Sequence, residues 1–163
     1  MKNSVNTHVL RATRVLCGSM DRLGEFLPQL GLRFLLAFEF WESGIEKVRG
    51  ENWFADIQDR FPFPFDLVPV DISWLLATWS ELFGAMALVI GLGTRLFSAL
   101  LMVLTVVAWV SVHTGNGYNV CGNGFKLPLI YLVMLMPLVF SGPGRLSIDH
   151  LIARRFNGDA SAG

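Results

Sequence analysis

The chain has 163 residues, of which 53% are hydrophobic and 16% are charged. Because soluble domains carry about a quarter charged residues, this composition excludes an ordinary soluble domain and indicates a membrane protein. The 13 basic and 13 acidic residues cancel, so the chain lacks the positive field that attracts nucleic acid. The length suits a single domain over residues 1–163.

The first predicted element is an amphipathic helix over about residues 8–27. Its apolar positions recur at helical spacing, and its charged positions occupy the opposite side. The apolar set is Val9, Leu16, Met20, Leu23 and Leu27, and the charged set is Arg14, Asp21, Arg22 and Glu25. This pattern is typical of a helix on a membrane surface, and its charges interrupt the apolar run that a signal peptide needs.

Four segments are apolar enough to span a bilayer, at about residues 30–48, 72–92, 96–113 and 125–140. A transmembrane helix needs about 17–25 such residues, and the last segment is short enough to need local thinning or flanking anchors. Ser147 and Asp149 are candidate caps for a final amphipathic helix that ends near Phe156. The predicted fold class is an all-α, integral membrane four-helix bundle with amphipathic surface helices at both ends.

Basic residues predict the orientation of this bundle. Four lie on the side of the first and third connections, namely Lys47, Arg49, Arg60 and Lys126. Eight lie on the side that holds both termini, namely Lys2, Arg11, Arg14, Arg22, Arg95, Arg145, Arg154 and Arg155. Since basic residues accumulate on the cytoplasmic side, both termini are expected in the cytoplasm.

The first span carries three carboxylates on one helical face, at Glu39, Glu42 and Glu46. Charge inside a bilayer is costly, so this face is expected to meet the bundle interior or water rather than lipid. Glu81 in the second span and Glu39 each lie nine residues from the outer end of their segment, which predicts that they meet at one depth. A functional cavity for a proton, a cation or a small molecule is one reading. A buried network that holds the helices in register is the other.

Residues at the outer mouth of this acidic shaft offer metal ligands and polar groups. His113 and Cys121 are a borderline and a soft ligand, a pair that suits copper better than magnesium or calcium. The other polar residues expected at the mouth are Arg49, Tyr118 and Lys126. Cys17 lies on the opposite side of the membrane, so the two cysteines are not expected to pair. The chain contains no CxxC and no CxxCH motif, which argues against covalent haem, whereas a bound quinone leaves no motif.

Arg33 lies near the inner end of the first span, roughly opposite the glutamates by helical angle. It is therefore not their obvious partner, and its side chain is expected to extend toward the inner headgroups.

Several stretches of this chain together resemble the DoxX family of small bacterial membrane proteins. They are RFLLAFEFWESGIEKV, ELFGAMALVIGLGTRLFSALLM, VSVHTG and FSGPGRLSIDHLI, within about Leu30 to Leu151. The matching motif positions include Arg33, Gly44, Lys47, Glu81 and Gly84. The resemblance implies a multi-pass protein of the bacterial inner membrane, in a family with members linked to quinone-coupled oxidation.

The segment GNGYNVCGNGFKLPLIYLVMLMPLVFSGPG resembles most closely the DoxX-type proteins of gene clusters for copper-binding, post-translationally modified peptides. This resemblance implies an accessory role in the maturation, anchoring or export of such a peptide, or in copper stress handling. The implied partners are the lipid bilayer, the peptide and its biosynthetic proteins, with copper or a quinone as candidate cofactor. A quinone-linked oxidoreductase subunit with a carboxylate proton path and a non-catalytic scaffold are the alternatives. No catalytic residue is identified, and whether the chain is an enzyme or forms an oligomer stays open.

Overall fold

The computed structural model describes residues 17, 18, 20, 21, 23, 24 and 26–159, and all regular elements in these residues are helical. Most of the amphipathic helix predicted over residues 8–27 therefore lies outside the described residues. Four helices pack side by side: α2 (Leu27–Arg49), α3 (Val70–Ile90), α4 (Thr94–Ala108) and α5 (Lys126–Phe140). In sequence they correspond to the four predicted spans.

Local sequence sets the ends of these helices. Pro28 lies in the first turn of α2, where its missing N–H is not needed. α3 follows Pro69 and ends at Gly91, whose φ of 70° is the left-handed conformation that glycine adopts without strain. α4 continues as a π-helix, η3 (Trp109–His113), so the continuous helical segment runs to His113, where the third predicted span ends.

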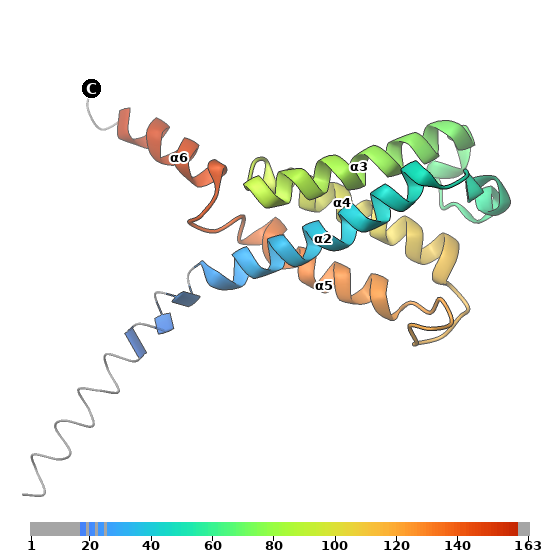
Figure 1. Cartoon of the computed structure of the whole chain (residues 1–163), viewed down its shortest axis with the longest axis horizontal. Coiled ribbons are helices and arrows are strands. Elements are labelled where there is room, and N and C mark those ends of the chain that lie inside the picture. Colours follow the sequence, from blue (N-terminus) through green and yellow to red (C-terminus); the bar gives the residue numbers. More distant parts are fainter. Residues whose placement is uncertain (1–16, 19, 22, 25, 160–163) are drawn as a thin grey trace, which may run out of the picture.

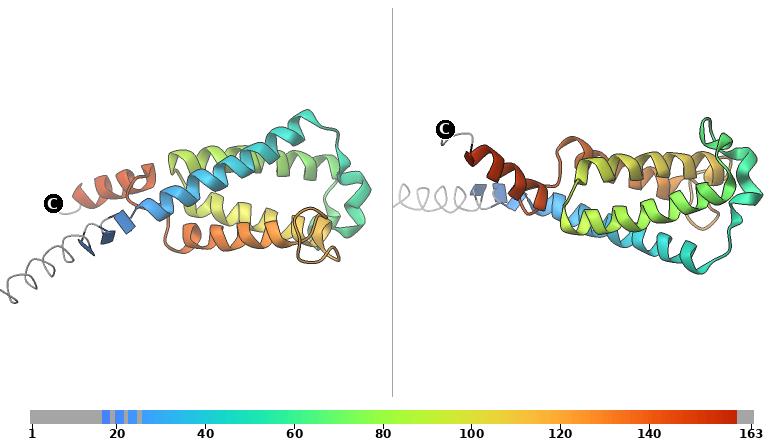
Figure 2. Two further views of the ribbon diagram at one scale, coloured as in Figure 1. Left: turned by 60° about the horizontal axis from the view of Figure 1, so that its bottom comes forward. Right: turned by 90° about the horizontal axis from the view of Figure 1, so that it is seen from above.

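The helices form a ring in which α2 contacts α3, α3 contacts α4, α4 contacts α5 and α5 contacts α2 (Figures 1 and 2). The space between them is filled by apolar side chains that are almost fully buried. These are Leu36, Ala37, Phe40, Ala85, Leu88, Leu101, Leu135 and Leu138. α3 and the segment Thr94–His113 are long and apolar enough to cross a membrane, and α5 is a shorter apolar helix.

Two glycines allow the close approach of neighbouring helices. A Cβ atom on Gly44 would lie 2.7 Å from Leu82 Cδ2, and one on Gly84 would lie 2.9 Å from Leu101 Cδ1. Ala77 and Ala87 on α3 and Gly91 at its end are also buried, and small residues of this kind are typical of closely packed helix interfaces. α2, α3 and α4 therefore pack more closely than side chains of ordinary size would permit.

Different segments cover the two ends of the bundle. At one end lie two 3₁₀ helices, η1 (Trp53–Arg60) and η2 (Phe65–Leu67), with η3 and the segment that joins α4 to α5. At the other end, α6 (Ile148–Asp159) leaves the bundle and lies outside the four packed helices (Figure 1). These are called the η1 end and the α6 end below. Ser147 caps α6, as predicted, because its Oγ accepts a hydrogen bond from His150 N–H at 3.1 Å.

Candidate functional site

Lys47 and Glu81 form an ion pair between α2 and α3, in the half of the bundle nearer the η1 end. Lys47 Nζ lies 2.8 and 2.9 Å from the two carboxylate oxygens of Glu81 and 2.8 Å from Ser43 Oγ. The two side chains are only 13% and 7% exposed. The three ammonium protons therefore have three acceptors, and the pair is neutral and internally satisfied.

Glu39 has a different partner, Tyr131 of α5. The tyrosine hydroxyl donates to Glu39 Oε2 at 2.5 Å, a distance typical of a hydrogen bond from a hydroxyl to a carboxylate. Tyr131 also packs its ring against Phe40. Glu39 thus ties α2 to α5, while Lys47 ties α2 to α3.

The predicted meeting of Glu39 and Glu81 at one depth is wrong. A Cβ on Gly44 would lie 3.4 Å from Glu81 Cβ, so Glu81 is level with Gly44, about five residues or roughly 7 Å along α2 from Glu39. The sequence argument counted from the segment ends, whereas α2 and α3 pack in the register that the contact between Gly44 and Leu82 imposes.

Glu42 and Glu46 do not face the bundle interior. The sequence predicted that their face of the helix would meet either the bundle interior or water. Both are exposed on the surface of α2. The residues of α2 that face its neighbours are Arg33, Leu36, Ala37, Phe40 and Gly44. The four glutamates therefore do not line one shaft: Glu81 is buried in the ion pair, Glu39 lies half-buried beside α5, and the other two are exposed.

Four of the predicted mouth residues, His113, Tyr118, Cys121 and Lys126, lie in the connection between α4 and α5 or at its ends, whereas Arg49 is the last residue of α2. His113 Nδ1 lies 2.8 Å from the carbonyl oxygen of Asn123. Because a carbonyl only accepts, Nδ1 carries a proton, so Nε2 is the ring nitrogen left to act as a ligand. Cys121 is exposed with a free thiol, and Cys17 is likewise exposed and free.

The rest of the mouth is held by aromatic and amide contacts. Lys126 Nζ lies 5.4 Å from the centroid of the Tyr118 ring, within the range of a cation–π contact. Asn119 Oδ1 accepts a hydrogen bond from Gly122 N–H at 2.7 Å, and Arg49 is exposed. Within the described part of the chain, no three His, Cys, Asp or Glu side chains are grouped so that they could hold a metal ion.

At the α6 end, Arg33 is buried and does not extend to the headgroups, so that prediction is wrong. Its side chain is 2% exposed and donates to four backbone carbonyls. Two belong to the last turns of α3, at Leu88 (2.7 Å) and Val89 (2.8 Å). The others belong to the segment after α5, at Pro143 (3.1 Å) and Leu146 (2.6 Å). Arg33 therefore neutralises the negative end of α3 and holds the segment that leads to α6.

Asp149 makes the second set of contacts at the α6 end, and Arg33 and Asp149 with their partners are called the clamp below. Asp149 caps α4, whereas the sequence predicted that it caps α6. Its carboxylate accepts hydrogen bonds from Gly93 N–H (2.7 Å) and Thr94 N–H (2.9 Å) at the start of α4. Its own N–H donates to Gly91 O at 3.0 Å. A Cβ on Gly91 would lie 2.6 Å from Arg33 Nη2, so only glycine fits between the arginine and this segment.

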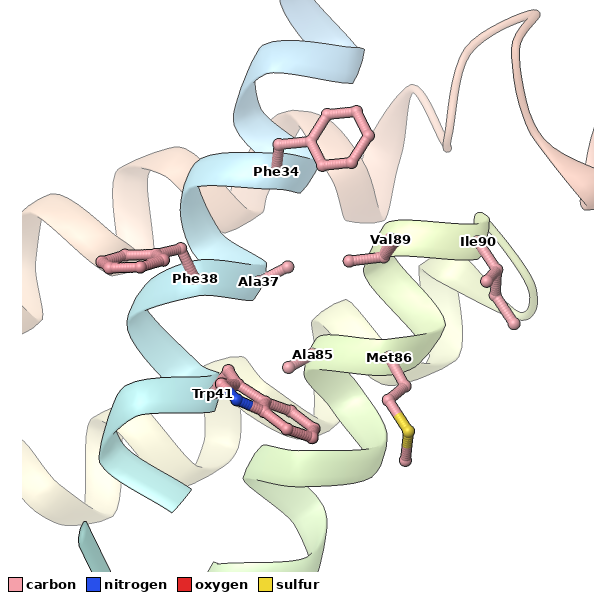
Figure 3. A pocket seen from close by; sticks show the side chains of 8 residues that line it. All are labelled: Phe34, Ala37, Phe38, Trp41, Ala85, Met86, Val89 and Ile90. Atoms are coloured by element: carbon pink, nitrogen blue, oxygen red, sulfur yellow. The ribbon is translucent and has the colours of Figure 1, made fainter. Parts of the chain in front are cut away.

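An apolar groove of about 590 Å³ runs between α2 and α3 on the surface of the bundle. Ala37 and Ala85 lie between the two helices (Figure 3). Around them are larger side chains, namely Phe34, Phe38 and Trp41 from α2 and Met86, Val89 and Ile90 from α3. The Trp41 indole N–H is the one hydrogen-bonding group among these side chains. None of the four glutamates lines this groove.

Sequence reasoning missed two functional partners, Lys47 and Tyr131. A signal was present for Lys47, because a carboxylate inside the bundle, such as Glu81, needs a cation as its partner. Lys47 lies one helical turn beyond Gly44, the residue that packs beside Glu81. Nothing in the sequence distinguishes Tyr131, since its pairing depends on how α5 packs against α2.

We expect the contact between Tyr131 and Glu39 to contribute to stability as a pair. Tyr131→Phe should lower the free energy of unfolding by about 1–3 kcal/mol, because Glu39 loses a donor inside the bundle. Glu39→Leu should have a similar cost, and Glu39→Gln a smaller one because its amide oxygen still accepts. Thermal unfolding in detergent measures these changes, with exposed Tyr118→Phe as the control. Fully additive effects in the double variant Tyr131→Phe/Glu39→Leu would contradict the pairing.

Comparisons with known proteins agree with the helical architecture. The DoxX family model matches residues 29–114, which is more than half of the chain. An uncharacterized protein of Haemophilus influenzae is 53% identical over 135 residues, covering 83% of this chain and 89% of that protein. A second uncharacterized protein of the same organism is 33% identical over 83 residues, covering 49% of this chain and 62% of that protein. No solved structure matches.

Proposed function

Because the chain belongs to the DoxX family of membrane proteins, we propose that it is an accessory protein of the bacterial inner membrane that handles copper at its η1 end. In this proposal all four packed helices span the bilayer, both termini are cytoplasmic and the η1 end faces the periplasm. The copper is held for, or passed to, a copper-binding modified peptide. The subtype of the family and this orientation are part of the proposal, which rests on the sequence resemblance and on the features of the η1 end.

The observation that carries the proposal is the hydrogen bond between His113 and Asn123. Histidines that bind metals commonly donate their second ring N–H to a carbonyl or carboxylate, which fixes the ring and leaves the other nitrogen as ligand. His113 has this arrangement, with Nδ1 held by Asn123 O and Nε2 left for a ligand. Cys121 belongs to the same connection and offers an exposed thiol, the ligand type that Cu(I) favours.

The electrostatics of the η1 end also favour a cationic ligand. Exposed carboxylates there outnumber the basic side chains Arg49, Arg60 and Lys126. They are Glu46, Glu51, Asp56, Asp59, Asp66 and Asp71. Since Lys47 is neutralised by Glu81, it does not offset them. A surface of one sign raises the local concentration of counter-ions, so copper ions or a cationic peptide are attracted to this end.

Copper binding to the purified protein tests the proposal. Wild type, purified in detergent under reducing conditions, should retain Cu(I), and the double variant His113→Ala/Cys121→Ser should retain at least about ten-fold less, because both ligands are lost. Cys17→Ser is the matched control for loss of an exposed thiol and should bind like wild type. Equal copper retention by wild type and the double variant would overturn the proposal.

A quinone-linked role is a second candidate, and the apolar groove between α2 and α3 is the observation that favours it. The groove could hold an isoprenoid chain, and Trp41 would be the one side chain able to donate a hydrogen bond to a quinone carbonyl. Quenching of tryptophan fluorescence by added ubiquinone, lost on Ala37→Phe, would support this role. If neither copper nor quinone binds, the scaffold function is the remaining reading.

A further inference from the structure

We propose that α6 is an interfacial anchor for anionic lipid, with its apolar first turns among acyl chains and Arg154 and Arg155 bound to the phosphates of lipid headgroups. The inference concerns the α6 end and does not depend on the copper site. It rests on the position, the exposed apolar face and the charge of α6.

The clamp at the α6 end fixes where α6 begins. Arg33 binds the carbonyls of Pro143 and Leu146 just before α6, and Asp149 binds the backbone N–H groups of Gly93 and Thr94. Those groups belong to the turn between α3 and α4, which lies at the end of two apolar helices. The first turn of α6 is therefore held at the level where these helices leave the hydrocarbon of the bilayer.

One face of α6 is apolar and has no partner in the part of the chain that the structure describes. Ile148, Leu151 and Ile152 lie at spacings of three and four, so they share this face, and they are 38%, 63% and 42% exposed. Leu146, just before α6, is 55% exposed. An apolar helix face held next to the membrane boundary is favourably covered by lipid acyl chains.

The charge of α6 complements an anionic surface. Arg154 and Arg155 are exposed, and Arg95 at the start of α4 is exposed at the same end. The carboxylate of Asp149 is engaged by backbone N–H groups, so it does not compete for these arginines. This combination of an apolar face with adjacent arginines is typical of segments that bind anionic lipids.

The distances along α6 place the two arginines within side-chain reach of the headgroup layer. Arg154 and Arg155 follow Ile148 by six and seven residues, which is about 9–10 Å along a helix. The headgroup layer is roughly 5–7 Å thick on each side of the hydrocarbon, and an arginine side chain can extend back toward it. α6 leaves the bundle end and points away from it (Figure 2), so the arginines lie farther from the hydrocarbon than the apolar turns do.

Lipid selectivity of the full-length protein tests the headgroup contact. In phosphatidylcholine vesicles that contain spin-labelled phosphatidylglycerol, wild type should immobilise the anionic label in preference to labelled phosphatidylcholine. Arg154→Gln/Arg155→Gln should lower this preference by about five-fold or more, the factor for one arginine at an anionic surface. Arg49→Gln/Arg60→Gln is the matched control and should leave the preference unchanged, because acidic residues lie next to those arginines in the sequence, at Glu46, Glu51, Asp56 and Asp59. Unchanged selectivity in the α6 variant would overturn the proposal.

A depth measurement tests the apolar face separately. The measurement compares nitroxide labels at two exposed positions on opposite sides of α6, introduced by Leu151→Cys and by Ala153→Cys. Both variants also carry Cys17→Ser and Cys121→Ser, so that only the new cysteine is labelled. In vesicles of unlabelled phosphatidylcholine and phosphatidylglycerol, the label at residue 151 should be reached by oxygen and the label at residue 153 by a water-soluble relaxation agent. Equal exposure of both labels to water would overturn the proposal. So would spin–spin broadening at residue 151, because the apolar face would then pack on a second copy of the chain.

Discussion

Arg33→Leu is expected to destabilise the protein by about 3–5 kcal/mol, because hydrogen bonds to a charged group contribute about 1.5–3 kcal/mol each. The variant removes four such bonds and leaves the carbonyls of Leu88 and Val89 without their buried donor. The loss is smaller than the sum, because water can reach the carbonyls of Pro143 and Leu146 once the segment after α5 detaches. Thermal unfolding in detergent measures the change, with the fraction of protein that stays monodisperse after heating as the readout.

Two further variants separate the charge of Arg33 from its geometry. Arg33→Lys keeps the charge but cannot reach carbonyls on both sides with one nitrogen, so it should recover less than half of the lost stability. Gly91→Ala leaves Arg33 in place but brings a methyl group within 2.6 Å of Nη2, at a φ of 70°, and should also destabilise. Arg95→Leu, an exposed arginine at the same end, should change stability by no more than about 0.5 kcal/mol. An equally small change in Arg33→Leu would contradict the clamp.

Lys47→Met should have an effect of similar size, a loss of about 3–5 kcal/mol, because it leaves the buried Glu81 carboxylate without its cation. Glu81→Gln should cost less, about 1–2 kcal/mol, since the long stem of Lys47 lets its ammonium move toward the η1 end and water. The double variant Lys47→Met/Glu81→Gln should be more stable than Lys47→Met alone. Unfolding of the four proteins in one detergent gives the coupling energy of the pair.

The control for this cycle is Arg49→Met, which removes an exposed cation two residues from Lys47. It should leave stability within about 0.5 kcal/mol of wild type. If Lys47→Met behaves like this control, Glu81 has another partner and the ion pair does not hold α2 to α3. If Glu81→Gln is the more damaging variant, Lys47 rather than Glu81 is the residue that depends on the pair.

The sequence by itself determined which segments become helices and where several of them end. Long apolar runs favour helix, because a helix satisfies its own backbone hydrogen bonds, so the four packed helices were predictable without a structure. Gly91 and Ser147 are local signals, since one adopts a left-handed backbone and the other caps the helix that follows it.

Only the tertiary structure decided which polar groups meet, because pairing depends on how far one helix slides along its neighbour. The glutamates of α2 were correctly placed on one helical face, but that face does not point into the bundle. Glu39 lies half-buried beside α5, and Glu42 and Glu46 are exposed. The contact of Gly44 with Leu82 sets Glu81 beside Lys47 rather than Glu39, and the packing of α5 brings Tyr131 to Glu39. Arg33 was expected at the headgroups because the sequence does not show that the carbonyls at the end of α3 and the segment after α5 converge on it. Helix formation depends on neighbours along the chain, whereas the register between helices depends on side chains that are far apart in sequence.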